Sequence, residues 1–202
     1  MPISHKYKTI FVHIPKTAGT SIEKAIGIKA LDKTAYRHRE EAGIRGVSYA
    51  LQHYTAEMLM AENSIVPYWK SYYKFAFVRH PYTRVLSEYF WVKGKKKQGL
   101  EFTRQAFKDH LNSYYIKLNT DHKLSQTQYI YSSAGKPLVD RVFKFEKIKS
   151  SFKVLSNRLK LESKLEHMQR SSNSNIIELD DDDKDFIYQL YQDDFKNFNY
   201  NR

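Results

Sequence analysis

The chain has 202 residues, 41% of them hydrophobic and 15% aromatic, which is enough apolar material for a sizeable core. Its 34 lysines and arginines against 22 acidic residues give a net charge of +12, which favours anionic partners such as nucleotides, nucleic acid, anionic lipid or acidic glycans. Cysteine is absent, so disulfides, thiolate nucleophiles and cysteine metal sites are excluded.

Three further absences bear on the cellular compartment. No run of about 18 apolar residues occurs, which excludes a membrane span, and the N-terminus lacks the pattern of a signal peptide. The sequence also has no Asn-x-Ser/Thr sequon. Together with the missing cysteine, these features predict a cytoplasmic protein, or a lumenal one if a targeting segment has been trimmed.

The first part of the chain has the pattern of a strand, a loop and a helix. Residues 7–14 (YKTIFVHI) are rich in β-branched and aromatic residues and predict a buried strand that Pro15 ends. Residues 21–28 have helical character, so a short loop of small and hydroxyl residues joins the two elements. A further short helix is expected over residues 51–62, with Thr55 as its N-cap.

A second apolar run, residues 73–78 (YKFAFV), predicts another buried strand. Arg79-His80-Pro81 closes it, and a helix follows over residues 82–92 with Pro81 at its first position. The remaining expected elements are a basic loop over 94–99, helices over 102–115 and 148–161, a strand over 139–145, a polar loop over 167–175, and a closing helix through Asp194 that the acids 180–183 cap. Alternating strands and helices predict an α/β fold with a largely parallel sheet, in a single domain over residues 1–202.

The loop after the first strand, with the sequence HIPKTAGTS, has the composition of an anion site. Backbone N–H groups between a strand and a helix attract phosphate or sulfate. Hydroxyl donors come from Thr17, Thr20 and Ser21. Gly19 allows a close backbone approach, and Lys16 adds a full charge. The loop does not match the G-x-x-x-x-G-K-[ST] pattern of nucleoside-triphosphate sites, and a generic capped turn remains the alternative.

The segment PKTAGTS after a strand resembles the 5′-phosphosulfate loop of sulfotransferases that use 3′-phosphoadenosine-5′-phosphosulfate (PAPS). The resemblance is to the carbohydrate branch, the sulfotransferase family 2-like group with its heparan and chondroitin enzymes. It implies a P-loop-like three-layer sandwich with a central, mostly parallel sheet flanked by helices. It also implies that the 5′-phosphate and sulfuryl group are held by Lys16, Thr17, Ala18, Gly19, Thr20 and Ser21. Lys16 would contact the bridging oxygen and stabilise the charge that develops as the nucleotide leaves.

A second signature of that family is an arginine at a strand end and a serine on the following helix, which both grip the nucleotide 3′-phosphate. The segment FAFVRHPYTRVLSEYFW has Arg79 and Ser87 eight positions apart, as the family motif requires. On the predicted helix, Ser87 shares a face with Arg84 and Trp91, away from the apolar face. Alone, Arg79 could make a surface salt bridge and Ser87 could be an exposed helix serine.

Transfer to a hydroxyl needs a group that accepts the hydroxyl proton, and histidine suits this at neutral pH. His53, in LQHYTAEML, resembles the family's Gly-His step, although Gln52 stands in place of the glycine. His53 is therefore the predicted base, with a histidine that caps the next helix as the alternative. Glu57 and Glu62 are weaker candidates.

Two other histidines are given no catalytic part. His13, on the first strand, is expected to pack or to form a hydrogen bond. His80 follows the motif arginine, where the family more often has aspartate.

The resemblance extends from Phe11 to Tyr200, through LSQTQYIYSSAGKPLVDRVFKFEKI and the closing YQDDFKNFNY. A polar loop over 167–174 stands where the family closes over the cofactor, so Arg170, Ser171 and Ser172 are predicted to reach phosphate oxygens. The implied donor is PAPS, with adenosine 3′,5′-bisphosphate as its product and with no metal ion. The implied acceptor is a carbohydrate hydroxyl. If the basic surface binds the acceptor, this carbohydrate is an acidic polysaccharide.

Two other function classes compete with this interpretation. A nucleotide-dependent phosphotransferase of the kinase type would need a standard P-loop and a Mg²⁺-binding carboxylate, and the P-loop is missing. A non-catalytic nucleic-acid module would use the positive charge and the 16 tyrosines. Those tyrosines are scattered through apolar patterns, which favours packing, so no nucleic-acid partner is expected.

Overall fold

The computed structural model describes residues 2–28, 36–37, 49–95, 103–115, 121–162 and 178–202. The sequence-predicted loop over 167–175, with Arg170, Ser171 and Ser172, lies outside the described residues, as do residues 96–99 of the predicted basic loop.

A four-stranded sheet forms the centre of the molecule. Its strands are β1 (Ile3–Ser4), β2 (Thr9–Val12), β5 (Tyr73–Val78) and β6 (Arg141–Lys144), in the order β1-β2-β5-β6. β2, β5 and β6 are parallel, and β1 is an antiparallel edge strand that folds back onto β2. The α/β class and the mostly parallel sheet are therefore confirmed. A separate two-stranded sheet pairs β3 (Tyr36–Arg37) with β4 (Tyr49–Ala50).

The two central strands are apolar because both faces of the sheet are covered. Successive side chains of a strand point to opposite faces. On β2, Phe11 packs on one face with Phe75 of β5, their rings 5.0 Å apart, while Ile10 and Val12 pack on the other. Phe77 continues the first face by stacking on Phe143 of β6.

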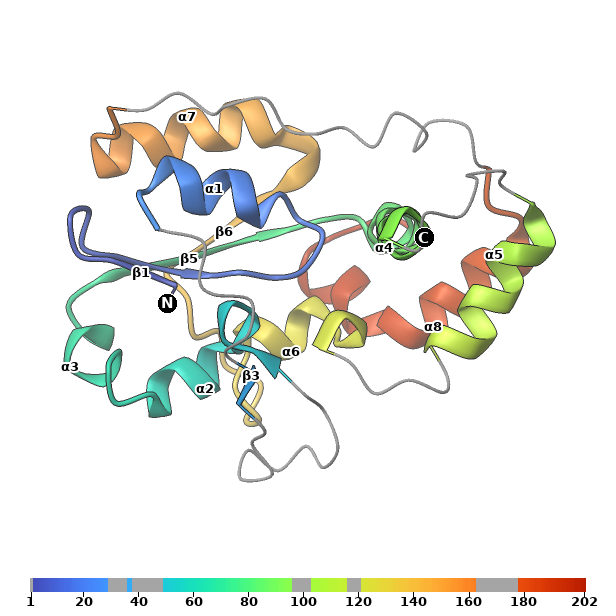
Figure 1. Ribbon diagram of the computed structural model, residues 1–202, viewed down its shortest axis with the longest axis horizontal. Coiled ribbons are helices and arrows are strands. Elements are labelled where there is room, and N and C mark those ends of the chain that lie inside the picture. Colours follow the sequence, from blue (N-terminus) through green and yellow to red (C-terminus); the bar gives the residue numbers. More distant parts are fainter. Residues whose placement is uncertain (1, 29–35, 38–48, 96–102, 116–120, 163–177) are drawn as a thin grey trace.

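Helices cover each face of this sheet, which gives three layers (Figure 1). One face carries α1 (Gly19–Ala25) and α7 (Ile148–Leu159), and the other carries α2 (Ala56–Ala61), α3 (Val66–Trp69) and α6 (Gln126–Ile130). α7 turns Ile148, Phe152 and Leu155 inward at helical spacing. Thr55 caps α2 by accepting a hydrogen bond from Met58 N, as the sequence predicted.

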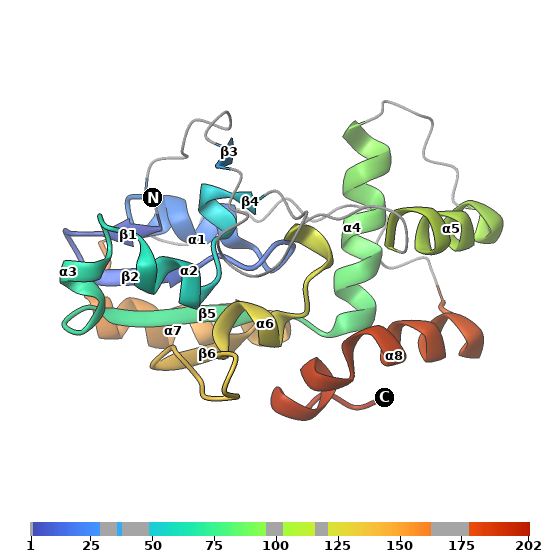
Figure 2. The same cartoon turned by 90° about the horizontal axis from the view of Figure 1, so that it is seen from below.

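Three further helices stand beyond the carboxyl ends of the parallel strands (Figures 1 and 2). They are α4 (Pro81–Lys95), α5 (Arg104–His110) and α8 (Asp181–Asn197), which share an apolar cluster. α4 starts at Pro81 and crosses the strand direction. Asp180 caps α8 in a capping box with Asp183, so the acidic run is a helix start, as predicted. A kink at Tyr191 interrupts α8.

Several boundaries differ from the sequence prediction. Gly94 and Lys95 belong to α4 rather than to a loop. Within the helix predicted over 102–115, the described part is α5 followed by a π-helical turn, Leu111–Tyr115. Short 3-10 turns over Leu51–His53, Asp121–Lys123 and Phe145–Lys147 were not predicted. In the described part of the chain, no helix is long and apolar enough to cross a membrane.

Candidate active site

The loop that follows β2 has an unusual backbone. Lys16 and Ala18 adopt left-handed conformations, with φ of 70° and 72°, while Thr17 between them does not. Such alternation turns successive N–H groups toward one concavity, which is an arrangement that binds anions. The N–H groups of Ser21 and Ile22 return to the Ala18 carbonyl at 3.1 and 3.3 Å, so the loop passes directly into α1.

The hydroxyl residues of this loop are not equivalent. Thr17 is fully buried, and its Oγ1 donates to the Ile14 carbonyl at 2.8 Å. Its hydroxyl proton therefore braces the loop rather than serving a bound anion. Thr20 is exposed and Ser21 half-buried, which leaves these two hydroxyls nearer to solvent.

Gly19 is required for packing against a neighbouring histidine. A Cβ at this position would stand 1.9 Å from Nε2 of His13, so the imidazole occupies the space that a side chain would fill. The ring is held there by a buried hydrogen bond of 2.8 Å between His13 Nδ1 and Glu23 Oε1. The packing and hydrogen-bonding role expected of His13 is confirmed, and Gly19 provides the space for its ring.

We therefore expect Gly19→Ala to destabilise the protein by about 2–4 kcal/mol, because the methyl group must displace a packed ring and its buried hydrogen bond. Thermal unfolding measures this loss. The matched control is Gly135→Ala, where φ is +74° but a Cβ would meet no atom within 4 Å. It should lose only about 1–2 kcal/mol from backbone strain. Equal losses in the two variants would contradict the packing argument.

At the end of β5, the backbone of Arg79 is clamped on both sides. Its N–H donates to Gln126 Oε1 at 2.7 Å, and its carbonyl accepts from Gln126 Nε2 at 2.8 Å. Gln126 is itself fully buried and held by Asp194 of α8, whose carboxylate also accepts from the Thr127 N–H. Arg79 is thus fixed by α6 and α8 together. Gln126 belongs to the LSQTQ segment of the predicted family resemblance.

His80, which follows Arg79 beyond the end of β5, is held by two other segments of that resemblance. The His80 N–H donates to Glu146 Oε1 at 2.6 Å, and the Tyr200 hydroxyl donates to Glu146 Oε2 at 3.0 Å. Glu146 follows β6, and Tyr200 lies near the end of the chain. The His80 ring reaches the Asn201 carbonyl at 3.1 Å. Segments distant in sequence therefore meet at the end of one strand.

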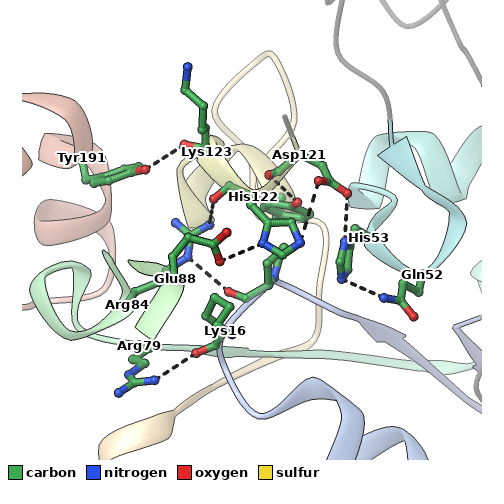
Figure 3. Close-up of polar contacts among 12 residues, drawn as sticks. Lys16, Gln52, His53, Arg79, Arg84, Glu88, Asp121, His122, Lys123 and Tyr191 are labelled. Carbon is green, nitrogen blue, oxygen red and sulfur yellow. Dashed lines mark hydrogen bonds and ion pairs between the residues drawn. The ribbon is translucent and has the colours of Figure 1, made fainter. Parts of the chain in front are cut away.

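The side chain of Arg79 bridges the ends of β2 and β5. Its Nη1 donates to the Lys16 carbonyl at 3.3 Å, its Nε donates to Thr83 Oγ1 at 3.1 Å, and its guanidinium lies over the Phe145 ring. Burial lowers the pKa of Arg79 to about 10, against a smaller opposing effect of Glu146. The guanidinium therefore stays charged at neutral pH. Its positive charge lies beside the loop after β2, at the Lys16 carbonyl (Figure 3).

One face of α4 lines the same region. Arg84 is buried, and it donates to the Pro15 carbonyl at 3.3 Å and to the His122 carbonyl at 3.0 Å. One turn further on, Glu88 contacts His122, and Trp91 stacks on the same imidazole. Ser87 is half-buried and shares this face by helical spacing, as the sequence predicted. The apolar face of α4 packs in the opposite direction, against α5 and α8.

His53 is buried, and both of its nitrogens have partners. Nδ1 lies 2.9 Å from Asp121 Oδ2 and donates to this carboxylate. Nε2 lies 3.2 Å from the Gln52 side-chain amide nitrogen, which donates to it. These contacts select the tautomer with the proton on Nδ1, so the lone pair of Nε2 is available to accept a proton. Burial lowers the pKa of His53 to about 4, although the Asp121 hydrogen bond raises it, so the ring is neutral at pH 7.

Three imidazoles form a row through this site. The rings of His13 and His53 are 4.9 Å apart, and those of His53 and His122 are 5.0 Å apart. His122 Nδ1 lies 2.8 Å from Glu88 Oε2. Lys16 Nζ lies 5.1 Å from the centre of the Trp91 ring, next to this row. The predicted base and the predicted leaving-group residue therefore belong to one cluster.

Asp121, His122 and Glu88 were not predicted as site residues. Asp121 is 68 positions from its partner His53, and no local pattern joins them. The only signal in the sequence is a carboxylate and a histidine side by side, which is too common to single out.

The comparisons with known proteins agree with this geometry. A family model described as "Sulfotransferase family" matches residues 1–201 of the chain. A search of curated proteins finds no match to it.

Proposed function

The chain belongs to the sulfotransferase family, and from this premise we propose that it transfers the sulfuryl group of PAPS to an acceptor hydroxyl. The acceptor that we propose is a carbohydrate. One observation carries the proposal. A buried histidine in the proton-accepting tautomer lies beside a cationic loop with left-handed residues at the carboxyl ends of β2 and β5. In open α/β sheets, this edge is where ligands bind.

The residues around this edge suit a nucleotide with phosphates at both ends. The 5′-phosphosulfate would be held by the loop residues Lys16, Thr17, Ala18, Gly19, Thr20 and Ser21. Thr17 would contribute its backbone N–H, because its hydroxyl donates to the Ile14 carbonyl. Arg79, with a rigid backbone and a charged guanidinium, and Ser87 on α4 would hold the 3′-phosphate. Arg170, Ser171 and Ser172 remain proposals of the same kind.

When bound, PAPS supplies an activated sulfuryl group on a phosphate leaving group. Lys16 would hold its ammonium against the bridging oxygen and so stabilise the negative charge that develops there. For this the side chain must turn from its present contact with the Trp91 ring toward the loop. Trp91 would thereby lose a cationic neighbour when the donor binds.

His53 would accept the proton of the acceptor hydroxyl at Nε2. Asp121 would keep the proton on Nδ1 and stabilise the imidazolium that forms. The Gln52 amide now occupies the position from which an acceptor hydroxyl would donate, so it must move aside when the acceptor binds.

A carbohydrate acceptor is supported by the likeness to the carbohydrate branch, and the net charge of +12 favours an acidic one. The absence of cysteine and of sequons supports a reducing, cytoplasmic compartment.

Ligand-dependent thermal stability tests the proposal. PAPS or adenosine 3′,5′-bisphosphate should raise the melting temperature, because a ligand that binds only the folded state stabilises it. ATP with Mg²⁺ and oligonucleotides should do little. Stabilisation by an oligonucleotide alone would overturn the enzyme proposal. If PAPS or adenosine 3′,5′-bisphosphate stabilises the protein, a screen of acceptor hydroxyls with radiolabelled PAPS identifies the acceptor class.

Arg79→Ala is expected to weaken the binding of adenosine 3′,5′-bisphosphate about 10- to 100-fold, because it removes charge-assisted hydrogen bonds to a phosphate. Isothermal titration calorimetry measures the dissociation constant. Arg158→Ala is the matched control, since it removes the same charge from the exposed face of α7. An unchanged dissociation constant in Arg79→Ala would remove this residue from the 3′-phosphate site.

A further inference from the structure

Two histidines face one carboxylate beside the predicted base. His53 Nδ1 lies 2.9 Å from one oxygen of Asp121, and His122 Nε2 lies 4.0 Å from the other. Donor atoms of the three residues all lie within 4.8 Å of one another. We propose that His53, Asp121 and His122 form a binding site for a divalent transition-metal ion such as Zn²⁺, and that the bound ion inhibits the protein.

The donor set favours zinc. Two imidazoles and one carboxylate, with a fourth position left to water, are a common ligand set for Zn²⁺. Bonds of 2.0–2.2 Å in a tetrahedral site place the ligand atoms about 3.3 Å apart. His53 Nδ1 now lies 2.9 Å from Oδ2 of Asp121, and His122 Nε2 lies 4.0 Å from Oδ1, so the side chains must rotate to bring one carboxylate oxygen and both nitrogens to a single ion. Mg²⁺ prefers all-oxygen ligands and should bind poorly here.

His122 already has the form that a metal requires. Its Nδ1 donates to Glu88 Oε2 at 2.8 Å, and its Nε2 faces Oδ1 of Asp121 at 4.0 Å (Figure 3). A carboxylate behind a ligating histidine fixes the ring and increases its basicity, and loss of such a partner weakens metal binding about 10- to 100-fold. Trp91 stacks on the same ring at 4.8 Å and holds its plane. Glu88 and Trp91 are therefore positioning residues for the proposed site.

Inhibition follows from the chemistry of one ring. The proton of neutral His53 lies on Nδ1, where it is donated to Asp121, and the lone pair lies on Nε2. A metal ion between His53 and Asp121 needs the Nδ1 lone pair, so the proton must move to Nε2. Nε2 can then no longer accept a proton from an acceptor hydroxyl. Metal binding and proton acceptance thus require opposite tautomers of one residue. This inhibitory effect, unlike the metal binding itself, rests on the proposed function.

Direct binding tests the site without any substrate. Calorimetric titration of the whole chain with ZnCl₂ should give one Zn²⁺ per chain. Nitrogen-15 NMR of the imidazoles should show the His53 proton moving from Nδ1 to Nε2. MgCl₂ should give neither signal. Binding with no change at the His53 nitrogens would overturn the proposed site.

Variants separate this site from other histidines on the surface. Asp121→Asn and His122→Ala should each lower the Zn²⁺ affinity at least tenfold, and Glu88→Gln should lower it about 10- to 100-fold. His5→Ala removes an exposed histidine elsewhere and should leave the affinity unchanged. Circular dichroism and a cooperative thermal transition show which variants fold. Glu88→Gln leaves all three metal ligands in place, so it keeps the test valid if another variant does not fold. Equal Zn²⁺ affinity in all the folded variants would overturn the proposal.

The inhibitory effect is measured separately, in a transfer assay with PAPS. Zn²⁺ should abolish turnover of the unmodified protein at the concentration that fills the site, and a chelator should restore it. Zinc binding in a protein that transfers no sulfuryl group would refute the proposed function and keep the metal site. Turnover that saturating Zn²⁺ leaves unchanged would refute the inhibition.

Discussion

His53→Ala should lower turnover with PAPS and a competent acceptor by about 10² to 10⁴-fold, which is the range that a positioned general base contributes. The loss should fall on turnover, because both ring nitrogens have their partners in Asp121 and Gln52 rather than in the loop that would hold the nucleotide. The dissociation constant for adenosine 3′,5′-bisphosphate should stay within about twofold. Steady-state kinetics together with calorimetry separate these two quantities.

The pH dependence of the unmodified protein provides a second measure of the same residue. A base is active when it is deprotonated, and burial lowers the pKa of His53 to about 4 in the free protein. The ratio kcat/KM reports ionisations of the free protein. It should therefore stay level as the pH falls through 6.5, the usual pKa of histidine, and decline only near pH 5 and below. A midpoint near 6.5, or turnover within threefold of normal in His53→Ala, would assign the base elsewhere. His5→Ala is the control for a general effect of losing a histidine.

Lys16→Ala should lower turnover by about 10² to 10³-fold, since it removes the ammonium group that we propose stabilises charge on the leaving group, an effect worth about 3–4 kcal/mol. Binding of PAPS should weaken far less, because the contact between Lys16 and the leaving group strengthens as the bond to the leaving group breaks. Single-turnover kinetics at saturating PAPS measure the chemical step directly. Lys24→Ala, on the exposed surface of α1, is the control for lost positive charge. Near-normal turnover in Lys16→Ala would remove this residue from the mechanism.

Much of the fold was predictable because its signals are local. The apolar runs that became β2 and β5 are short, bounded and covered on both faces, so their composition alone identifies them. Thr55, Pro81 and Asp180 mark helix starts by well-understood chemistry. β1 escaped prediction because its two residues carry no period and the turn before β2 lacks a glycine. The kink in α8 has no proline or glycine to announce it.

The site was predictable only where its motifs are continuous. The loop after β2 and the Arg79 to Ser87 spacing can be identified from neighbouring residues. The pairing of His53 with Asp121 cannot, because it joins two 3-10 turns whose paired residues are 68 positions apart in the sequence. The packing of the His13 ring against Gly19, six positions later in the chain, was not predicted either, because no sequence pattern links the two residues.

The convergence of late segments on Arg79 has a consequence for biosynthesis. A ribosome delivers Lys16 and Arg79 early, but the clamp on Arg79 depends on Gln126, which Asp194 holds, and the neighbouring strand end needs Tyr200. Domains fold as units during synthesis. A nascent chain that stops short of residue 194 thus carries the loop after β2 and Arg79 without the contacts that hold the Arg79 backbone. We therefore expect the protein to gain its ligand affinity in one late step of translation. A protease that removes the C-terminal turns of α8 should likewise abolish this affinity without cutting the loop after β2 or Arg79.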